Sequence, residues 1–160
     1  MPLCEVSVRC LDAPSQNAAK LDELEALCQN HGITISYQSS TKRLKATAGT
    51  ILQRCLSQVE NFRTRMNKNL CVYKVGLTSH PSLRFQFYKE ANYTHMTLLH
   101  VTEHSGTAQM LEAALIAFHL SQHGCRNERF GGEGPPAAHE EPFHFVYIVG
   151  ARADCMKPIR

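Results

Sequence analysis

No C-x-x-C pair and no regular spacing occurs among the seven cysteines of this 160-residue chain. An odd number of scattered cysteines argues against both a disulfide framework and a structural zinc site. Most of the seven stand within apolar patterns, which favours small buried hydrophobic residues in a reducing compartment. Their positions are Cys4, Cys10, Cys28, Cys55, Cys71, Cys125 and Cys155.

The chain also lacks a segment that would direct it into or across a membrane. Its first residues, Met1 to Glu5, contain no basic stretch followed by an apolar run, and no apolar stretch elsewhere approaches the length of a membrane span. We therefore expect an intracellular protein, cytoplasmic or nuclear, that has no membrane partner.

Neither sign of charge is in large excess. The chain has 17 lysines and arginines against 14 aspartates and glutamates, a net charge of +3, and nine histidines. A weakly basic chain permits a nucleic-acid partner without requiring one. Its length suits one domain of ordinary size with a real hydrophobic core.

The first third of the chain predicts the element order β-α-β-β-α. Strands are indicated by alternation of apolar and polar residues, and helices by apolar residues three and four apart. These elements fall at residues 4–11, 18–31, 33–37, 42–47 and 49–66. We expect residues 1–68 to form an extension packed on a core of residues 69–150, and an independent small domain is the alternative.

The stretch Cys71–Gly76 predicts a buried strand, because it is rich in β-forming residues and ends at a glycine. Pro81 then predicts the first turn of a helix. Arg84 and Tyr88, four residues apart, share one face of this helix. Its buried stripe is expected at Leu83, Phe87 and Ala91.

A further strand is expected from Met96 to Val101, followed by a helix from about Thr107 to Gln122 with Ser105 as its N-cap. This helix is almost wholly apolar around Glu112. A carboxylate in such a position is costly to bury unless a cation or a metal ion meets it. Glu112 is therefore a candidate site residue.

The C-terminal part predicts a loop at residues 131–141, a closing strand at residues 143–149 and a tail without pattern at residues 151–160. Together the elements predict an α+β domain, in which a small, mainly antiparallel sheet is flanked by helices.

Four features follow one another between residues 71 and 130. They are Lys74-Val75-Gly76-Leu77-Thr78, then Pro81 and Arg84, then Leu111-Glu112-x-x-Leu115, then Arg126 to Phe130. This arrangement resembles the GIY-YIG nuclease superfamily, and most closely its phage-type branch, in which Lys-Ile-Gly-x-Thr stands in place of Tyr-Ile-Gly. The resemblance implies a metal-dependent endonuclease with a GIY-YIG-like core.

The resemblance assigns a role to three of these residues. Arg84 would bind the phosphate, Glu112 would be the sole protein ligand of Mg²⁺ or Mn²⁺, and Lys74 would orient water or lower the pKa of a neighbouring phenol. Each residue also has an ordinary interpretation. Arg84 fits a surface arginine, Glu112 one end of a structural ion pair, and Lys74 an edge-strand lysine that discourages sheet pairing.

One part of the superfamily pattern is missing. A Gly-Ile-Tyr strand should precede the Lys-Val-Gly strand, but residues 60–70 contain no tyrosine. We expect Tyr147 on the strand at residues 143–149 to supply it, through a circular permutation that makes this strand pair with the one at residues 71–77. Tyr147 would then lie beside Lys74, whose ammonium favours the phenolate. Tyr37 and Tyr73 are the alternatives, and Tyr147 also fits an ordinary core aromatic residue.

Basic residues early in the chain suit phosphate contacts that do not depend on sequence, although solvated faces are the simpler explanation. The nucleic-acid-binding candidates are Lys42, Arg43 and Lys45, with Arg126 and Asn127 after the Glu112 helix. The basic stretch continues in Arg54, Arg63, Arg65 and Lys68.

The expected function is hydrolysis of phosphodiester bonds of DNA, with RNA as the alternative substrate, using Mg²⁺ or Mn²⁺ and no small-molecule cofactor. The first alternative is a GIY-YIG-like module that binds nucleic acid or protein without catalysis. The second is a zinc-stabilised interaction domain, in which His119 and His123 act with Cys125 or His139.

Overall fold

The computed structural model describes residues 7–8, 18–38, 47–128 and 141–156. Their elements in chain order are β1 (Ser7–Val8), α1 (Ala18–Asn30), β2 (Thr34–Ile35), β3 (Tyr37–Gln38), α2 (Ala48–Arg65), β4 (Cys71–Thr78), α3 (Pro81–Glu90), β5 (His95–Thr102), α4 (Ser105–His119), β6 (His144–Arg152) and the short 3₁₀ helix η1 (Ala153–Cys155). The fold class is α+β, as the sequence predicts.

One four-stranded sheet, in the order β2-β5-β6-β4, forms the centre of the fold. Its long strands β4, β6 and β5 are antiparallel, and β2 adds to β5 in parallel. Strands β1 and β3 form a separate parallel pair. The sheet is therefore mixed but mainly antiparallel, and the last strand of the chain, β6, is inserted between β4 and β5.

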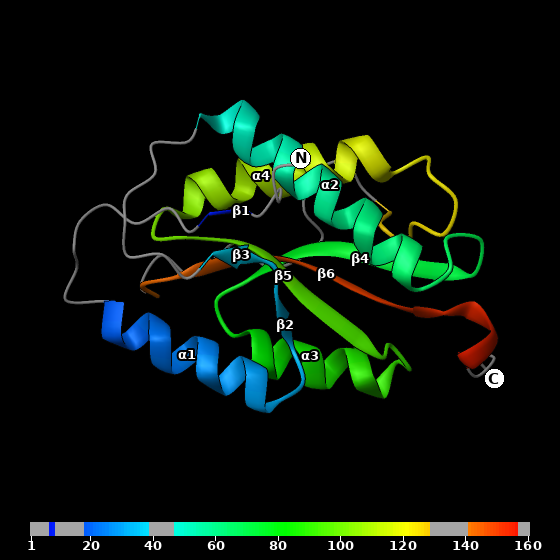
Figure 1. Cartoon of the computed structure of the whole chain (residues 1–160), viewed down its shortest axis with the longest axis horizontal. Helices are drawn as coiled ribbons and strands as arrows, with labels where there is room; N and C mark the ends of the chain where they lie inside the picture. Colours follow the sequence, from blue (N-terminus) through cyan, green and yellow to red (C-terminus); the bar gives the residue numbers. More distant parts are fainter. Residues whose placement is uncertain (1–6, 9–17, 39–46, 129–140, 157–160) are drawn as a thin grey trace, which may run out of the picture.

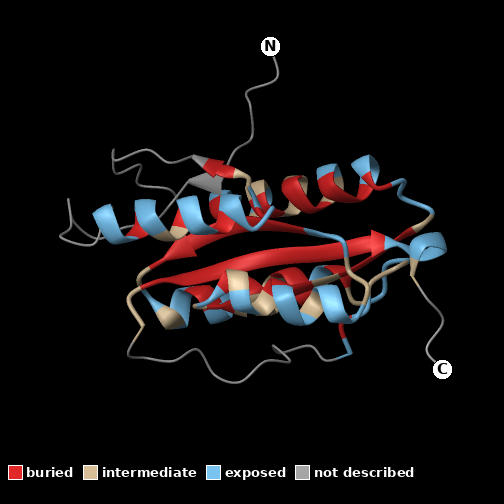
Figure 2. Cartoon of the chain, turned by 90° about the horizontal axis from the view of Figure 1, so that it is seen from below, coloured by how far each residue is buried: buried red, intermediate tan, exposed pale blue. Residues whose placement is uncertain are grey.

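Helices cover both faces of this sheet, with α2 and α4 on one face and α1 and α3 on the other (Figure 1). Each face has its own hydrophobic core, because successive strand residues point to opposite faces. Figure 2 shows the strands buried between helices whose outer surfaces are exposed. Strand β4 lies at one edge of the sheet, which gives access to both layers at once.

The N-terminal elements share the sheet and cores with the rest of the chain. Strand β2 extends the sheet, and α2 contributes Val59 and Phe62 to the same core as β4 and β6. The strand expected at residues 42–47, which holds Lys42, Arg43 and Lys45, lies outside the described residues. The strand at the C-terminal end extends further than expected, to Arg152, and continues into η1.

Two local expectations are wrong. Ser105 is not the N-cap of α4 but its first helical residue, and His104 occupies the cap position. The expected buried stripe of α3 faces outward, since Leu83 is 57% exposed and Phe87 is 69% exposed. Helix α3 instead buries Pro81 and Phe85 against the sheet, with Arg84 and Tyr88 half-buried beside them.

The described cysteines Cys28, Cys55 and Cys71 are buried, as expected for small hydrophobic residues. Burial raises the pKa of the Cys28 and Cys71 thiols to about 11, which keeps both protonated near neutral pH. Cys155 is exposed. In the described part of the chain no helix combines the length and the apolar character needed to cross a membrane.

Candidate active site at the edge of strand β4

The pairing of β4 with β6 brings the last strand of the chain to the Lys-Val-Gly motif. Gly76 lies opposite Tyr147 in the antiparallel register, and Lys74 lies opposite Val149. A Cβ added to Gly76 would overlap the hydroxyl and a ring carbon of Tyr147. Glycine at position 76 therefore lets the Tyr147 ring lie across β4 and reach towards the edge of the sheet.

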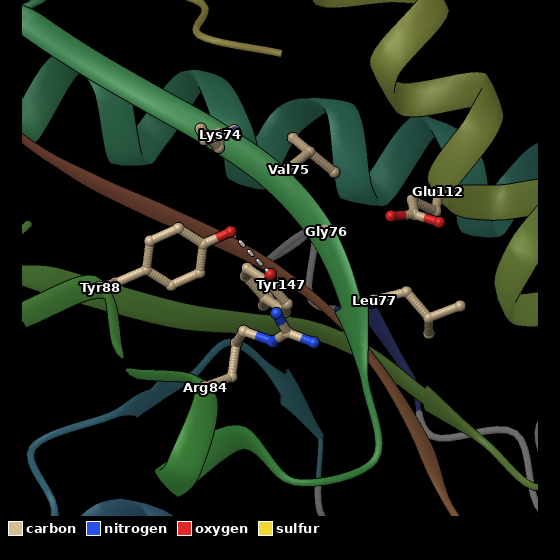
Figure 3. Close-up of a pocket in the computed structure, with 8 residues that line it drawn as sticks. All are labelled: Lys74, Val75, Gly76, Leu77, Arg84, Tyr88, Glu112 and Tyr147. Atoms are coloured by element: carbon tan, nitrogen blue, oxygen red, sulfur yellow. Dashed lines mark hydrogen bonds between the residues drawn. The ribbon is translucent and has the colours of Figure 1, made fainter. Parts of the chain in front are cut away.

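Helix α3 contributes two side chains from the same layer as Tyr147. The Tyr88 and Tyr147 hydroxyl oxygens are hydrogen-bonded at 3.0 Å, and their rings meet edge to face with centroids 5.9 Å apart. Arg84, four residues before Tyr88, lines the same pocket. Figure 3 shows its guanidinium beside the two phenols.

Glu112 reaches the site from the opposite layer. It lies on α4, is 7% exposed, and directs its carboxylate towards β4 (Figure 3). Helices α3 and α4 cover opposite faces of the sheet, so Arg84 and Glu112 reach a common pocket from opposite faces, at the edge strand β4. This pocket has a volume of about 190 Å³ and is lined by Lys74, Val75, Gly76, Leu77, Arg84, Tyr88, Glu112 and Tyr147.

The pKa of Tyr147 is raised well above its ordinary value. Burial is the main cause, the Tyr88 hydroxyl and the Glu112 carboxylate add to it, and the Arg84 guanidinium opposes it. The expectation of a phenolate favoured by Lys74 is therefore wrong for the chain without ligands. Tyr147 lies opposite Gly76, two residues from Lys74, and Lys74 and Tyr147 both line the pocket.

The segment after α4 covers the outer edge of β4. The Tyr73 amide donates to the Gly124 carbonyl at 2.9 Å, and the Arg126 amide donates to the Tyr73 carbonyl at 2.8 Å. One residue further, the Asn127 side chain accepts from the Val75 amide and donates to the Val75 carbonyl, both at 2.9 Å. Both ends of the Asn127 amide thus hold β4 in position next to the pocket.

These contacts change the expected role of Asn127. Because it is buried and both ends of its amide bond to Val75, it is a positioning residue and not a nucleic-acid contact.

Arg126 is exposed and lines a second hollow of about 320 Å³ at the other end of β4, together with Asn69 and His123. It remains a candidate for a phosphate contact. Arg63 does not, since it is buried.

The two alternative tyrosines lie elsewhere. Tyr73 points into the core on the α2 and α4 side, where its hydroxyl is hydrogen-bonded to His119 Nδ1 at 3.1 Å and the Arg63 guanidinium lies over its ring. Tyr37 belongs to the core on the other face and donates to Glu25 at 3.4 Å. Neither lines the pocket, whereas Tyr147 does.

No group of three or more histidine, cysteine, aspartate and glutamate side chains within the described ranges is arranged to hold a metal ion. Glu112 alone fits a different kind of site, in which one carboxylate and several waters bind a hard cation such as Mg²⁺. The pocket has room for such a hydrated ion. In the alternative zinc site, His119 is buried against Tyr73 while His123 is exposed, and His139 lies outside the described residues.

Tyr88 is the residue of this site that sequence reasoning left without a role. The sequence offered one indication of its place in the site: Tyr88 is four residues from Arg84, and this spacing puts both on one face of the helix. Comparison with known proteins identifies no relative: no family model, no curated protein and no solved structure matches the chain.

Proposed function

We propose that this protein is a metal-dependent endonuclease, which hydrolyses phosphodiester bonds of DNA at a circularly permuted GIY-YIG-like site. One observation carries the proposal. The resemblance singles out Lys74, Arg84, Glu112 and Tyr147, and with Gly76 they line one small pocket although 73 positions of sequence separate the first from the last. The central position of β6 beside β4 is the pairing that a permuted chain requires.

Arg84 supplies the charge that phosphoryl transfer needs. Its planar guanidinium can donate two parallel hydrogen bonds to a phosphate and stabilise the negative charge that grows on the phosphate oxygens in the transition state. Its place on α3 beside the pocket gives the phosphate a defined position relative to the phenols. Lys74 adds a second positive charge to the same lining.

Glu112 would hold the metal ion, which when bound polarises the phosphate and stabilises the leaving oxygen. In hydrolysis a water oxygen forms a bond to phosphorus and gives up a proton to the solvent, while the bond from phosphorus to the sugar oxygen breaks and that oxygen takes up a proton from the solvent. The hydroxyls of Tyr147 and Tyr88 are the groups of the pocket that can orient this water by hydrogen bonds. Burial raises the pKa of Tyr147, so its hydroxyl is protonated in the chain without ligands. We therefore assign this hydroxyl to orienting the water and not to accepting its proton.

A second candidate function is a binding module of the same fold that does not cut. The raised pKa of Tyr147 and its hydrogen bond to Tyr88 favour this alternative, because a protonated phenol is a poor general base. It predicts nucleic-acid binding that does not depend on Glu112.

Nicking of supercoiled plasmid DNA with Mg²⁺ or Mn²⁺ separates the two. We expect the wild type to nick, Glu112→Gln and Arg84→Ala to lose about 100-fold or more of the rate, and a chelator to abolish it. The glutamine conserves the volume of the buried side chain. Glu23→Gln, an exposed carboxylate on α1, is the matched control and should nick at the wild-type rate. Equal nicking by wild type and Glu112→Gln, or none by either, would reject the nuclease.

A further inference from the structure

The outward face of α3 carries two large apolar side chains that the fold does not cover. Leu83 is 57% exposed and Phe87 is 69% exposed, and their spacing of four places them side by side on the helix surface. The helix is anchored by Phe85 on its opposite side, which is 2% exposed. Two neighbouring apolar side chains that face water form a candidate contact surface when a functional pocket adjoins them.

This pair adjoins the candidate active site. Phe87 is three residues from Arg84 and directly precedes Tyr88, and both of these line the pocket. Residues three apart are neighbours on a helix surface, so Phe87 and Arg84 lie side by side on α3. The exposed apolar surface therefore begins where the phosphate-binding side of the pocket ends.

We propose that Leu83 and Phe87 form a stacking surface for an unpaired base of the nucleic-acid strand whose phosphate Arg84 binds. The inference rests on the proposed function, because it takes Arg84 as a phosphate ligand. A base is joined to its phosphate through one sugar, so a strand held at Arg84 carries its flanking bases past this face of α3. In a duplex the bases present only their edges in the grooves, whereas an unpaired base has a free face that stacks on aromatic rings. The preferred substrate is thus a single strand, or a loop or flap with unpaired nucleotides at the cleavage site.

A protein partner suits this surface less well. A stable protein interface buries about 800 Å² on each side, and an aromatic side chain supplies about 150–250 Å² at most. The exposed neighbours on the same helix are polar, namely Gln86, Lys89 and Glu90. The surface is large enough for one or two bases and close to charges that a phosphate backbone requires.

Binding can be measured without metal and without cleavage, by fluorescence anisotropy of a labelled oligonucleotide and of its duplex. We expect Phe87→Ala to weaken single-strand binding about 10-fold, Leu83→Ala to weaken it less, and neither to change duplex binding. The loss should be the same at every salt concentration, because stacking releases no counterions. Phe118→Ala is the control, since Phe118 is 61% exposed but lies on α4 on the other face of the sheet.

A direct probe is available because the chain contains no tryptophan. Phe87→Trp introduces a single indole, whose fluorescence an unpaired stacked base should quench, while binding remains near the wild-type level. The same indole at position 118 should not respond. The inference is overturned if Phe87→Ala binds a single strand as tightly as the wild type, or if the indoles at positions 87 and 118 are quenched equally. It is also overturned if Phe87→Ala changes the self-association of the protein, because the surface would then contact a second copy.

The outcomes separate this inference from the proposed function. Metal-dependent nicking that requires Glu112 but is insensitive to Phe87 would reject the stacking surface and leave the nuclease intact. Single-strand binding that requires Phe87, without nicking in Mg²⁺ or Mn²⁺, would support the stacking surface and reject catalysis.

Discussion

At the scale of single residues, the site depends on the absence of a side chain at Gly76. The Tyr147 hydroxyl can meet Tyr88 only because no side chain on Gly76 occupies the space between them. The glycine expected at the end of this strand predicts close approach of another group to the backbone, although β4 continues past Gly76 to Thr78. The sequence could not identify the group that approaches, since Tyr147 comes 71 positions later on a strand whose pairing is a property of the whole sheet.

We therefore expect Gly76→Ala to disturb the site more than its small size suggests. The added methyl group would force the Tyr147 ring away, lowering the free energy of unfolding by about 1–3 kcal/mol and the nicking rate at least 10-fold. Urea unfolding and plasmid nicking measure the two effects.

Gly49→Ala on α2 is the matched control, because nothing lies within 4 Å of a Cβ there. It should leave nicking unchanged and stability unchanged or slightly higher. If Gly76→Ala behaves like Gly49→Ala, Tyr147 does not depend on the gap at Gly76.

At the scale of elements, the sequence predicted which segments are helices and strands better than it predicted which way they face. Alternation and helical spacing are local properties, and they correctly indicated strands β4, β5 and β6 and helices α2, α3 and α4. Helix α3 shows the limit. It has apolar residues on two opposite sides, Leu83 with Phe87 and Pro81 with Phe85, so periodicity alone could not show that the sheet covers the second.

Three elements are joined by a buried polar cluster that sequence reasoning did not anticipate. Arg63 of α2 lies over the ring of Tyr73 on β4, and the Tyr73 hydroxyl meets His119 of α4. Arg63 also binds Glu60 at 2.8 Å and the His123 carbonyl at 3.1 Å. Glu60, Arg63 and His119 belong to amphipathic helices, and only the tertiary contact of α2 with α4 reveals them as neighbours.

This cluster predicts a loss of stability in mild acid. Burial lowers the pKa of His119 below its ordinary value of about 6.5, Arg63 adds to the lowering and Glu60 opposes it. Between the unfolded and the folded pKa the unfolded chain binds more protons, so stability falls as the pH drops below about 6.5. Each unit by which the pKa is lowered contributes about 1.4 kcal/mol.

Urea unfolding at pH 7.5 and 5.5 tests this prediction. His119→Gln should show a smaller loss of stability between the two pH values than the wild type. His123→Gln, which replaces an exposed histidine, should match the wild type. An identical pH dependence in His119→Gln and the wild type would contradict it.

At the scale of the whole molecule, the site lies at a seam between two layers. Tyr147, Tyr88 and Arg84 come from the α1 and α3 side, whereas Glu112 comes from the α2 and α4 side. At an edge strand, side chains of both layers can reach one pocket, because no further strand separates them. Residues 124–127 hydrogen-bond to the outer edge of β4 as far as Val75, and the pocket lies next to the end of this segment.

The order of β4 and β6 in the chain matters little to this arrangement. The Ala153 amide donates to the Leu70 carbonyl at 2.7 Å, so the end of β6 lies against the start of β4. A short hairpin there would let β6 precede β4 without moving either strand. The pairing of β6 with β4 that the sequence predicted thus has a simple physical basis, since the sheet is determined by which strands are neighbours.

Cations line the edge of the sheet along which a nucleic-acid strand would bind. Lys74 and Arg84 line the pocket and Arg126 is exposed at the second hollow, so three cations are distributed along β4. A strand of nucleic acid that follows this edge would contact them through its phosphates, whatever its sequence. We expect affinity to fall steeply with salt and to differ little between two unrelated sequences, because the described edge offers charges and no set of groups that reads base edges.

The contribution of each cation can be read from the salt slope. Arg84→Ala and Arg126→Ala should each reduce the slope of log K against log salt concentration by about 0.7 on a single strand, the amount expected for one lost phosphate contact. Lys20→Ala, an exposed lysine on α1, should leave the slope unchanged. A slope that no substitution alters, or strong preference for one sequence, would mean that nucleic acid does not follow the edge of β4. If Arg84→Ala alone reduces the slope, the strand meets the pocket and leaves the protein before it reaches the second hollow.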